Sequence, residues 1–266
     1  MRILFNSTEI TKEVEKLDTT SCSMTYVAGN FIYIASDFPF NHLFIKMGTV
    51  KNAIAVTMKI EYWDGSAWVQ VVELRDHTNG LFNDGFIEFT PHKQYLWSLE
   101  DESDDIPGFT KILYDKYWTR ISFNLTLTPS VDISFMGHKF SDDTDLFVEY
   151  PVFNDSSYLT AFKAGKTSWE EQAVKAAEMI SMDLMKKSVI LGPEQILERR
   201  KFIGASVCKV AEIIFTAFGN DYIDQKKAAH EEYYRRLDLS QYSVDTNGDA
   251  ILNSDEVKTK QGWLSR

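Results

Sequence analysis

The sequence has few of the features that cross-link a protein through cysteines or metal ions or anchor it in a membrane. It contains two cysteines, Cys22 and Cys208, with no metal-binding or redox spacing, so we expect reduced, buried thiols. No apolar run approaches the roughly 20 residues that a helix needs to span a bilayer, so we expect no membrane contact. The N-terminal segment turns polar too early for a secretory signal peptide. The composition, 44% hydrophobic and 25% charged, is ordinary for a globular protein, and we expect it in the cytoplasm or in an assembly built there.

Motifs of catalysis are also missing. The five histidines are scattered, and the sequence contains no Gly-x-Ser-x-Gly motif for a nucleophilic serine. Gly165-Lys166-Thr167 resembles the end of a phosphate-binding loop, but Thr160 stands where that motif needs its first glycine. We therefore interpret this stretch as a loop leading into a helix, and we predict that the protein is not an enzyme.

Charge is unevenly distributed along the chain, whose formal net charge is −11. Residues 1–150 hold 12 Lys and Arg against 22 Asp and Glu, whereas residues 151–266 are nearly balanced, with 16 against 17. An acidic first half repels phosphates, which argues against non-specific nucleic-acid binding there.

The first half has the pattern of β-strands. β-Branched and aromatic runs alternate with turn residues, and Asp64-Gly65 supplies a tight turn between two alternating runs. The expected strands lie within 31–35, 42–47, 53–63, 68–74, 85–90, 117–129 and 131–140. Residues 100–105, EDESDD, must form an exposed loop because five carboxylates cannot be buried together. This spacing predicts an antiparallel β-sandwich over residues 1–150.

Four tryptophans in this half allow two interpretations. Exposed, Trp63, Trp68, Trp97 and Trp118 could stack on sugars; buried, they would fill the core. Their alternation with polar neighbours favours the core.

The second half changes to a helical period. Ser168 followed by Glu171 predicts a capping box that opens a helix reaching about Lys187, and Gly192-Pro193 starts the next helix. Apolar residues at three- and four-residue spacing extend that helix to Gly219-Asn220. A third helix is expected over about 222–239. We predict an α-helical bundle with an extended C-terminal tail over residues 151–266.

The segment DTNGDAILNSDE, residues 245–256, follows the order of a calcium-binding loop. Oxygen ligands are expected at alternate positions and at position twelve, with a backbone carbonyl at the seventh. The candidate ligands are Asp245, Asn247, Asp249, Ile251 and Glu256. Ala250 replaces the usual glycine, and the loop is single. Two interpretations stay open: a structural Ca²⁺ loop, or an ion-free turn held by Asn and Asp side chains.

The order of segments in the second half resembles the head-to-tail adaptor (connector) proteins of tailed bacteriophages. The first segment in this order is the expected helix SWEEQAVKAAEMISMDLMKKS. The features that carry the resemblance are ERRKFIGASVCKVAEIIF, AHEEYYRRLDL and the DTNGDA turn. The match covers roughly residues 155–266, and the strand-rich half looks like β-sandwich modules of phage structural proteins.

This resemblance implies a structural virion protein of the neck, assembled in the host cytoplasm. It would form a homo-oligomeric ring, usually of twelve copies, between the portal protein and tail or collar proteins. DNA would pass through the channel without sequence-specific binding, and residues 245–266 would contact the portal.

Residue types add candidate interface positions to this picture. Tyr and Arg are enriched at interfaces, and the apolar end of the tail could dock into a partner. The candidates are Tyr233, Tyr234, Arg235, Arg236, Trp263, Leu264 and Arg266.

Two other functions remain as alternatives. One is a carbohydrate-binding or adhesion module of a phage or bacterial surface protein, in which Trp63 or Trp68 contacts sugars and the loop holds calcium. The other, less favoured, is a hydrolase within the strand-rich half.

Overall fold

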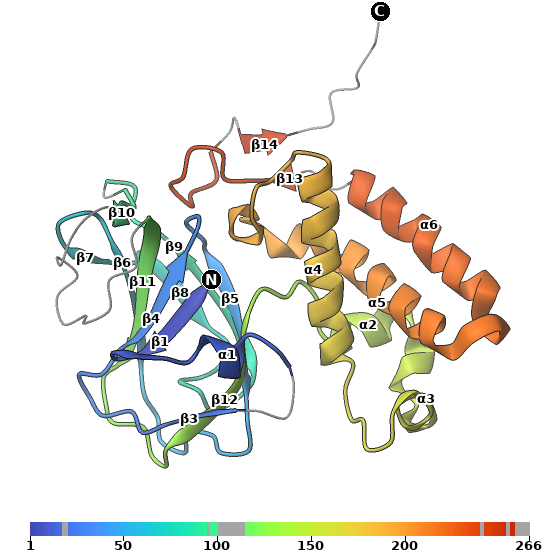
Figure 1. The fold of residues 1–266 in the computed structure, drawn as a ribbon, viewed down its shortest axis with the longest axis horizontal. Helices are drawn as coiled ribbons and strands as arrows, with labels where there is room; N and C mark the ends of the chain where they lie inside the picture. The colour runs from blue at the N-terminus through green and yellow to red at the C-terminus, as the bar shows by residue number, and fades with distance from the viewer. Residues whose placement is uncertain (18–20, 95, 101–114, 240–241, 254–255, 259–266) are drawn as a thin grey trace, which may run out of the picture. The chain divides into compact units, whose positions relative to one another are not determined.

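The computed structural model describes residues 1–17, 21–94, 96–100, 115–239, 242–253 and 256–258. The chain divides into two compact units (Figure 1). The first comprises Met1–Gly137 and Asp245–Ile251, and the second comprises His138–Val244 and Leu252–Arg266. An N-terminal region of antiparallel sheets is followed by a C-terminal helical region, as the two periodicities predict.

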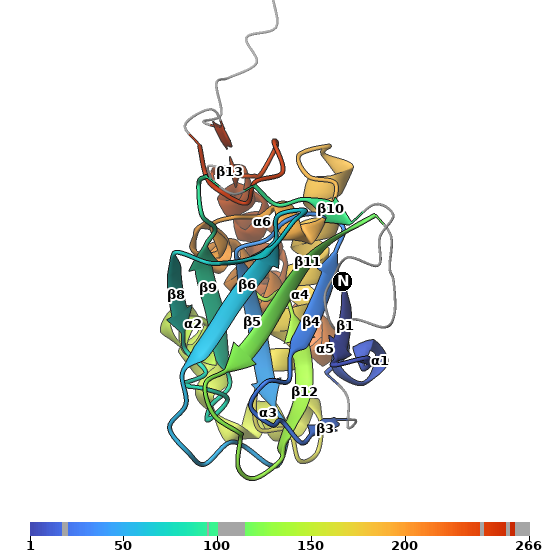
Figure 2. The same cartoon turned by 90° about the vertical axis from the view of Figure 1, so that its left-hand side faces the viewer.

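The first unit contains two antiparallel sheets (Figure 2). The strands of the seven-stranded sheet are β1 (Arg2–Phe5), β2 (Thr8–Glu9), β4 (Ile32–Ser36), β6 (Met58–Trp63), β7 (Trp68–Gln70), β10 (Leu99–Glu100) and β11 (Lys116–Phe123). Their order is β2-β1-β4-β11-β6-β7, with β10 also paired to β11. The expected turn at Asp64-Gly65 joins β6 to β7, and Gly65 has a φ of 94°, which glycine adopts without a steric penalty.

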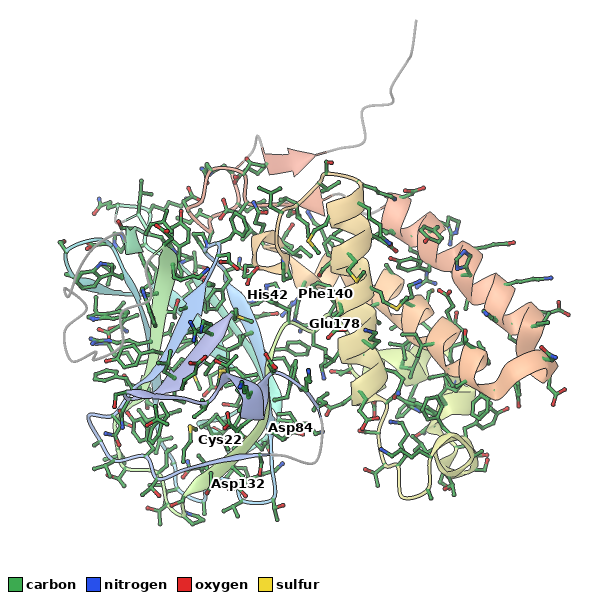
Figure 3. The ribbon with its side chains drawn as sticks, in the orientation of Figure 1. Cys22, His42, Asp84, Asp132, Phe140 and Glu178 are labelled. Atoms are coloured by element: carbon green, nitrogen blue, oxygen red, sulfur yellow. The ribbon has the colours of Figure 1, made fainter. Side chains whose placement is uncertain are left out.

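The second sheet has five strands. They are β3 (Cys22–Met24), β5 (His42–Met47), β8 (Glu73–Asp76), β9 (Gly85–Thr90) and β12 (Val131–Gly137), in the order β3-β12-β5-β9-β8. A short helix, α1 (Thr11–Val14), follows β2. Cys22 and Asp132, labelled in Figure 3, lie on the neighbouring strands β3 and β12. Cys22 is partly buried and Cys208 is buried, and both thiols are free.

The second unit is built around one buried helix. Its α-helices are α2 (Asp143–Glu149), α3 (Ser156–Phe162), α4 (Glu170–Lys186), α5 (Ile203–Phe218) and α6 (Ile223–Leu239). Short 3-10 helices connect them: η1 (Pro151–Asn154), η2 (Pro193–Gln195), η3 (Arg199–Phe202) and η4 (Gly219–Tyr222). Helix α5 packs against α2, α3, α4 and α6. A helix that is apolar on most sides is buried in this way, and Gly219 ends it with a φ of 80°.

Two apolar clusters hold these helices together. One joins α4, α5 and α6 and includes Ile180, Phe202 and Leu237. The other surrounds Trp169 and includes Phe153 and Phe215. Phe140 belongs to the first cluster and Leu146 to the second, so the chain enters the helical unit at His138. The division therefore falls earlier than the expected position 150, because these two side chains are buried among helices.

Helix α4 does not begin with the expected capping box. Its N-cap residue is Trp169, and no side chain of that residue caps the helix. The N–H of Trp169 instead donates to the carboxylate of Asp143, 26 residues earlier, at 3.0 and 3.1 Å. A partner from α2 thus replaces the predicted local pair of Ser168 and Glu171.

One stretch of the helical unit, residues 199–238, contains a window long and apolar enough to cross a membrane. More than half of that window is buried inside the protein, and the core helix of a soluble protein meets the same criteria. Among the described residues, this stretch therefore gives only weak support for a membrane span.

The short strands β13 (Tyr242–Ser243) and β14 (Val257–Lys258) pair with each other and flank the loop that resembles a calcium site. Most of the predicted acidic loop, residues 101–105, lies outside the described residues.

Candidate functional site

The loop after β13 is organised by the buried carboxylate of Asp245. This side chain is 1% exposed and accepts hydrogen bonds from three backbone N–H groups. The donors are Gly248 at 2.7 Å, Ala250 at 2.9 Å and Asp249 at 3.3 Å. A buried carboxylate needs such donors, because an ion without partners is expensive to bury. Asp245 therefore fixes the first half of the loop.

The next two candidate ligands continue the same turn. Asn247 accepts from the N–H of Asp249 at 3.1 Å and donates its side-chain amide to the Asp249 carboxylate at 3.1 Å. Asp249 in turn accepts from the N–H of Ile251 at 2.7 Å. These are the local side-chain to backbone bonds by which Asn and Asp stabilise turns. They correspond to the ion-free interpretation of the sequence.

Ala250 takes the conformation that glycine normally provides in this kind of loop. Its φ is 54°, in the left-handed region, and that of Gly248 is 81°. Such an alanine costs about 1–2 kcal/mol of conformational energy. The loop keeps the sharp bend despite the missing glycine, so Ala250 does not by itself exclude a calcium-loop backbone.

The last candidate ligand, Glu256, lies in the second unit and is 3% exposed. Its carboxylate accepts from the N–H of Asn253 at 3.1 Å, and its own N–H donates to the Asn253 carbonyl at 3.1 Å. The side chains of the set supply carboxylate and amide oxygens, the donors that Ca²⁺ prefers. In the part of the chain that the structure describes, no group of three or more His, Cys, Asp and Glu side chains is arranged to hold a metal.

Tyr233 occupies a different position from the one that an interface residue needs. It is fully buried between α4, α5 and α6, and its hydroxyl donates to Asp183 of α4 at 2.8 Å. The Lys209 ammonium lies 4.1 Å from the centre of its ring. Burial and the bond to Asp183 raise the pKa of Tyr233, which keeps the hydroxyl protonated. Tyr233 therefore joins helices within the unit, and the expectation that it faces a partner needs correction.

The other candidates on α6 lie at the surface or at its margin. Tyr234 is 37% exposed, and its ring contacts that of His230 edge-on. Arg235 and Arg236 both bind the carboxylate of Glu232, and their hydrogen bonds lower the pKa of Glu232 to about 2. Trp263, Leu264 and Arg266 lie outside the described residues.

Arg236 is partly exposed, and it also connects two helices of the unit. Its guanidinium also binds Glu149 of α2 at 2.6 Å, which ties α6 to α2 across the unit. An added Cβ on Gly204 would lie 2.9 Å from this guanidinium, so the glycine makes room for it. Of the four α6 candidates, Tyr234 and Arg235 are the most accessible.

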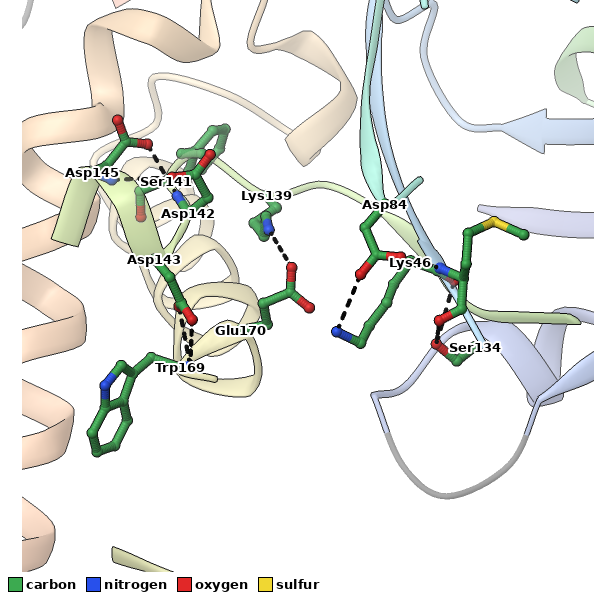
Figure 4. Close-up of polar contacts among 12 residues, drawn as sticks. Lys46, Asp84, Ser134, Lys139, Ser141, Asp142, Asp143, Asp145, Trp169 and Glu170 are labelled. Atoms are coloured by element: carbon green, nitrogen blue, oxygen red, sulfur yellow. Dashed lines mark hydrogen bonds and ion pairs between the residues drawn. The ribbon is translucent and has the colours of Figure 1, made fainter. Parts of the chain in front are cut away.

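A buried polar network supports the start of α4 (Figure 4). The side chain of Lys139 is completely buried, and its ammonium lies 3.0 Å from the carboxylate of Glu170. Burial lowers the pKa of Lys139, and Glu170 opposes that shift. Burial also raises the pKa of Asp143, which the Trp169 N–H opposes. The network joins the segment before α2 to the N-terminus of α4, where carboxylates also favour the helix dipole.

The tryptophans of the β unit are mostly core residues, as their alternation indicates. Trp63, Trp97 and Trp118 are 3%, 6% and 0% exposed. Trp68 is partly buried, and the guanidinium of Arg120 lies 4.5 Å from its ring centre and 4.3 Å from that of Phe31.

Arg120 is held in place by Glu61, whose carboxylate accepts from its Nε at 2.8 Å. Burial opposes ionisation of Glu61, but hydrogen bonds from Arg120 and Lys59 outweigh it and lower the pKa of Glu61. This ion pair holds the guanidinium of Arg120 near the rings of Phe31 and Trp68.

The loop containing Gly165-Lys166-Thr167 connects α3 to α4, as the interpretation against a nucleotide site requires. The Lys166 ammonium lies 3.1 Å from Glu171 and 5.4 Å from the centre of the Trp169 ring. It is thus engaged within the helical unit.

Exposed apolar side chains on the helical unit were not found by sequence reasoning. Besides Tyr234, they are Val148, Val152, Met182, Met185, Leu191 and Ile223. Helical spacing selects apolar residues for the core, so it gives no signal for those that fall on the opposite face. Val148 and Leu191 are the most exposed, at 77% and 76%.

No protein-family model matches the chain, and no curated protein is significantly similar to it.

Proposed function

We propose that this chain is a structural virion protein: a head-to-tail adaptor that forms a ring between the portal and the tail of a bacteriophage. The observation that carries the proposal is the order of the helical segments. The three segments with the adaptor-like pattern correspond to α4, η3–α5 and α6, which pack in one compact unit. Such a unit offers large helical surfaces for self-assembly.

The proposal also includes the way in which the sheets and the helices pack within each unit. We infer that the two sheets form a β-sandwich, which is supported by side chains buried between strands of different sheets. The Tyr26 hydroxyl, beyond the end of β3, accepts from the N–H of Phe123 in β11 at 2.8 Å, and their rings meet edge-on. The second unit would be a helical bundle around α5, with the β-sandwich as an outward module.

In this proposal the ring has about twelve copies and binds the portal through residues 245–266, with tail or collar proteins on its other side. DNA passes through its channel without sequence-specific contacts. No catalysis is assigned to the chain. Glycan stacking by Trp63 is less favoured, because this side chain is 3% exposed.

The loop at 245–256 would then be a rigid support for the portal-binding tail. Asp245, Asn247, Asp249, Ile251 and Glu256 would hold a Ca²⁺ ion if one binds, and the ion would supply cross-linking charge rather than chemistry. The hydrogen bonds of Asp245 support a turn that also stands without the ion.

Electron microscopy of the purified full chain tests the proposal directly. We expect rings, and we expect these rings to co-sediment with assembled portal rings. A chain that stays monomeric at high concentration and does not bind the portal would overturn it.

A further inference from the structure

Asparagine is followed by glycine at two places in the chain, Asn79-Gly80 and Asn247-Gly248. Asparagine loses its side-chain ammonia most readily before glycine, because glycine has no side chain to hinder the approach of the reacting groups. The backbone nitrogen of the glycine attacks Cγ of the asparagine, and an N–Cγ bond forms. The bond from Cγ to the amide nitrogen breaks, and ammonia leaves with the proton of the backbone N–H. Water then opens the resulting ring to aspartate or isoaspartate, so each pair is a site of spontaneous modification.

In both pairs the glycine N–H that must give up its proton is held by an aspartate. The N–H of Gly80 donates to the carboxylate of Asp76 at 2.8 Å, and the N–H of Gly248 donates to the carboxylate of Asp245 at 2.7 Å. These are the lengths of hydrogen bonds strengthened by charge. Loss of the proton would place a negatively charged nitrogen against a carboxylate, and two like charges at this distance repel each other.

The turn around Gly80 is fixed on both sides of the glycine. Asp76 also accepts from the N–H and the hydroxyl of Thr78, at 2.8 and 2.5 Å. The carbonyl of Gly80 accepts from the side-chain amide of Asn52 at 2.9 Å, and Asn52 is buried. The Gly80 nitrogen therefore cannot approach the Asn79 side chain without breaking bonds of this turn.

The turn around Gly248 is also held through the asparagine itself. The side-chain oxygen of Asn247 accepts from the N–H of Asp249, and its amide group donates to the Asp249 carboxylate, both at 3.1 Å. Asp245 accepts from the N–H of Ala250 at 2.9 Å as well as from that of Gly248. Both reacting groups of this pair, the glycine nitrogen and the asparagine amide, are therefore engaged by carboxylates.

We infer that Asp76 and Asp245 protect the two Asn-Gly pairs from deamidation, each by holding the N–H of its glycine. The inference goes beyond the proposed function and does not depend on it. It assigns the buried carboxylate of Asp245 a role that requires no metal ion. Deamidation of Asn247 would add a negative charge beside Asp245 and Asp249 and remove the amide donor that Asp249 binds, so the protection preserves the turn.

The bond to the carboxylate sets the size of the effect. The glycine N–H must leave its aspartate before the nitrogen can attack. A hydrogen bond to a charged group lowers the rate of such a step by about ten- to a hundredfold relative to a free N–H. We therefore expect each pair in the folded chain to react at least about tenfold more slowly than in the unfolded chain.

The test follows both pairs in the full chain by peptide mass spectrometry during incubation at mildly alkaline pH, in buffer and in urea. Asp76→Ala and Asp245→Ala each free one glycine N–H. Asp76→Ala should accelerate deamidation of Asn79 by about tenfold and leave Asn247 at its wild-type rate, and Asp245→Ala should do the reverse. The second pair of each variant is thus a matched control for folding, measured in the same molecules.

A wild-type chain that deamidates as fast in buffer as in urea would overturn the inference. So would a folded Asp245→Ala variant whose Asn247 reacts at the wild-type rate. If a variant unfolds, both of its pairs react at the rate seen in urea, and amide hydrogen exchange of the wild type then decides. The N–H groups of Gly80 and Gly248 should exchange slowly, and rapid exchange of either would contradict the role of its aspartate. None of these outcomes bears on the proposed function, which is tested by assembly.

Discussion

Tyr233 offers the sharpest test of whether an interface-type residue on α6 serves folding or assembly. Tyr233→Phe removes the hydroxyl that donates to the Asp183 carboxylate at 2.8 Å. A hydrogen bond to a charged group contributes about 1.5–3 kcal/mol, and Asp183 keeps a second contact, to Lys186 at 3.5 Å. We therefore expect a loss of about 2 kcal/mol in the free energy of unfolding.

Tyr233→Ala removes the buried ring as well. The aromatic side chain packs among α4, α5 and α6 and lies under the Lys209 ammonium, so its loss leaves a cavity. Large-to-small changes of this kind cost about 3–5 kcal/mol. The matched control is Tyr234→Ala, one position along, where the side chain is 37% exposed and the change should stay within about 1 kcal/mol.

The measurement is urea unfolding of the full chain, monitored by the circular dichroism signal of the helices. The slope of the transition should stay constant while its midpoint falls in the order Tyr234→Ala, Tyr233→Phe, Tyr233→Ala. The reasoning is refuted if Tyr233→Ala unfolds at the wild-type midpoint. It is also refuted if Tyr234→Ala is the more destabilising change.

Three further substitutions test the polar contacts described above. Asp245→Ala leaves three loop N–H groups without their acceptor and should lower stability by about 1–3 kcal/mol, whereas a calcium chelator should leave the wild-type melting temperature unchanged. Asp143→Ala removes the acceptor for the Trp169 N–H and should cost about 1 kcal/mol in urea unfolding. Glu61→Gln weakens the contact with Arg120 and should cost about 2 kcal/mol at neutral pH. Folding lowers the pKa of Glu61, so its ionised carboxylate stabilises the fold at pH values above the unfolded pKa of about 4.3. This stabilisation is lost as the pH falls through the folded pKa. The difference in stability between wild type and Glu61→Gln should therefore shrink below about pH 4.

Two of these substitutions have an exposed counterpart in the chain. Asn247→Ala removes two hydrogen bonds that lie at the surface, so it is the milder comparison for Asp245 and should cost about 0.5–1 kcal/mol. Glu73→Gln on β8 is the control for Glu61 and should change stability by less than about 0.5 kcal/mol. Global unfolding of wild type by a chelator would show that the ion is required for the fold. A Glu61→Gln variant with the wild-type acid transition would contradict the role assigned to that ion pair.

Sequence patterns predicted the type and order of the helices and strands better than the residues at which they begin and end. The change from period two to helical period predicted the order of strands and helices, because each period follows from local side-chain geometry. The start of α4 was predicted from Ser168 and Glu171, yet the cap comes from Asp143. A partner 26 residues away leaves no local signal, so only the folded chain shows it.

The candidate interface residues were only partly predicted, because the burial of a side chain also depends on contacts that only the folded chain shows. Composition indicated Tyr233 and Tyr234 together, but adjacent helical residues point in directions about 100° apart, so one is buried and the other is exposed. Likewise, no local pattern marked Val148 and Leu191 as surface residues, and only the tertiary packing shows that they are exposed. The turn chemistry of residues 245–251, by contrast, was predictable, because its bonds are local.

The assignment of Asp245–Ile251 to the first unit has a consequence for synthesis of the protein. The chain leaves that unit at Gly137 and supplies its last piece only after residues 138–244 have been made. At about 5–20 residues per second, the ribosome needs on the order of 5–20 s for that interval. Any folding of the β unit during this time takes place without its final segment. No single cleavage of the chain can therefore release both units whole, and a fragment ending at Gly137 would carry an incomplete β unit.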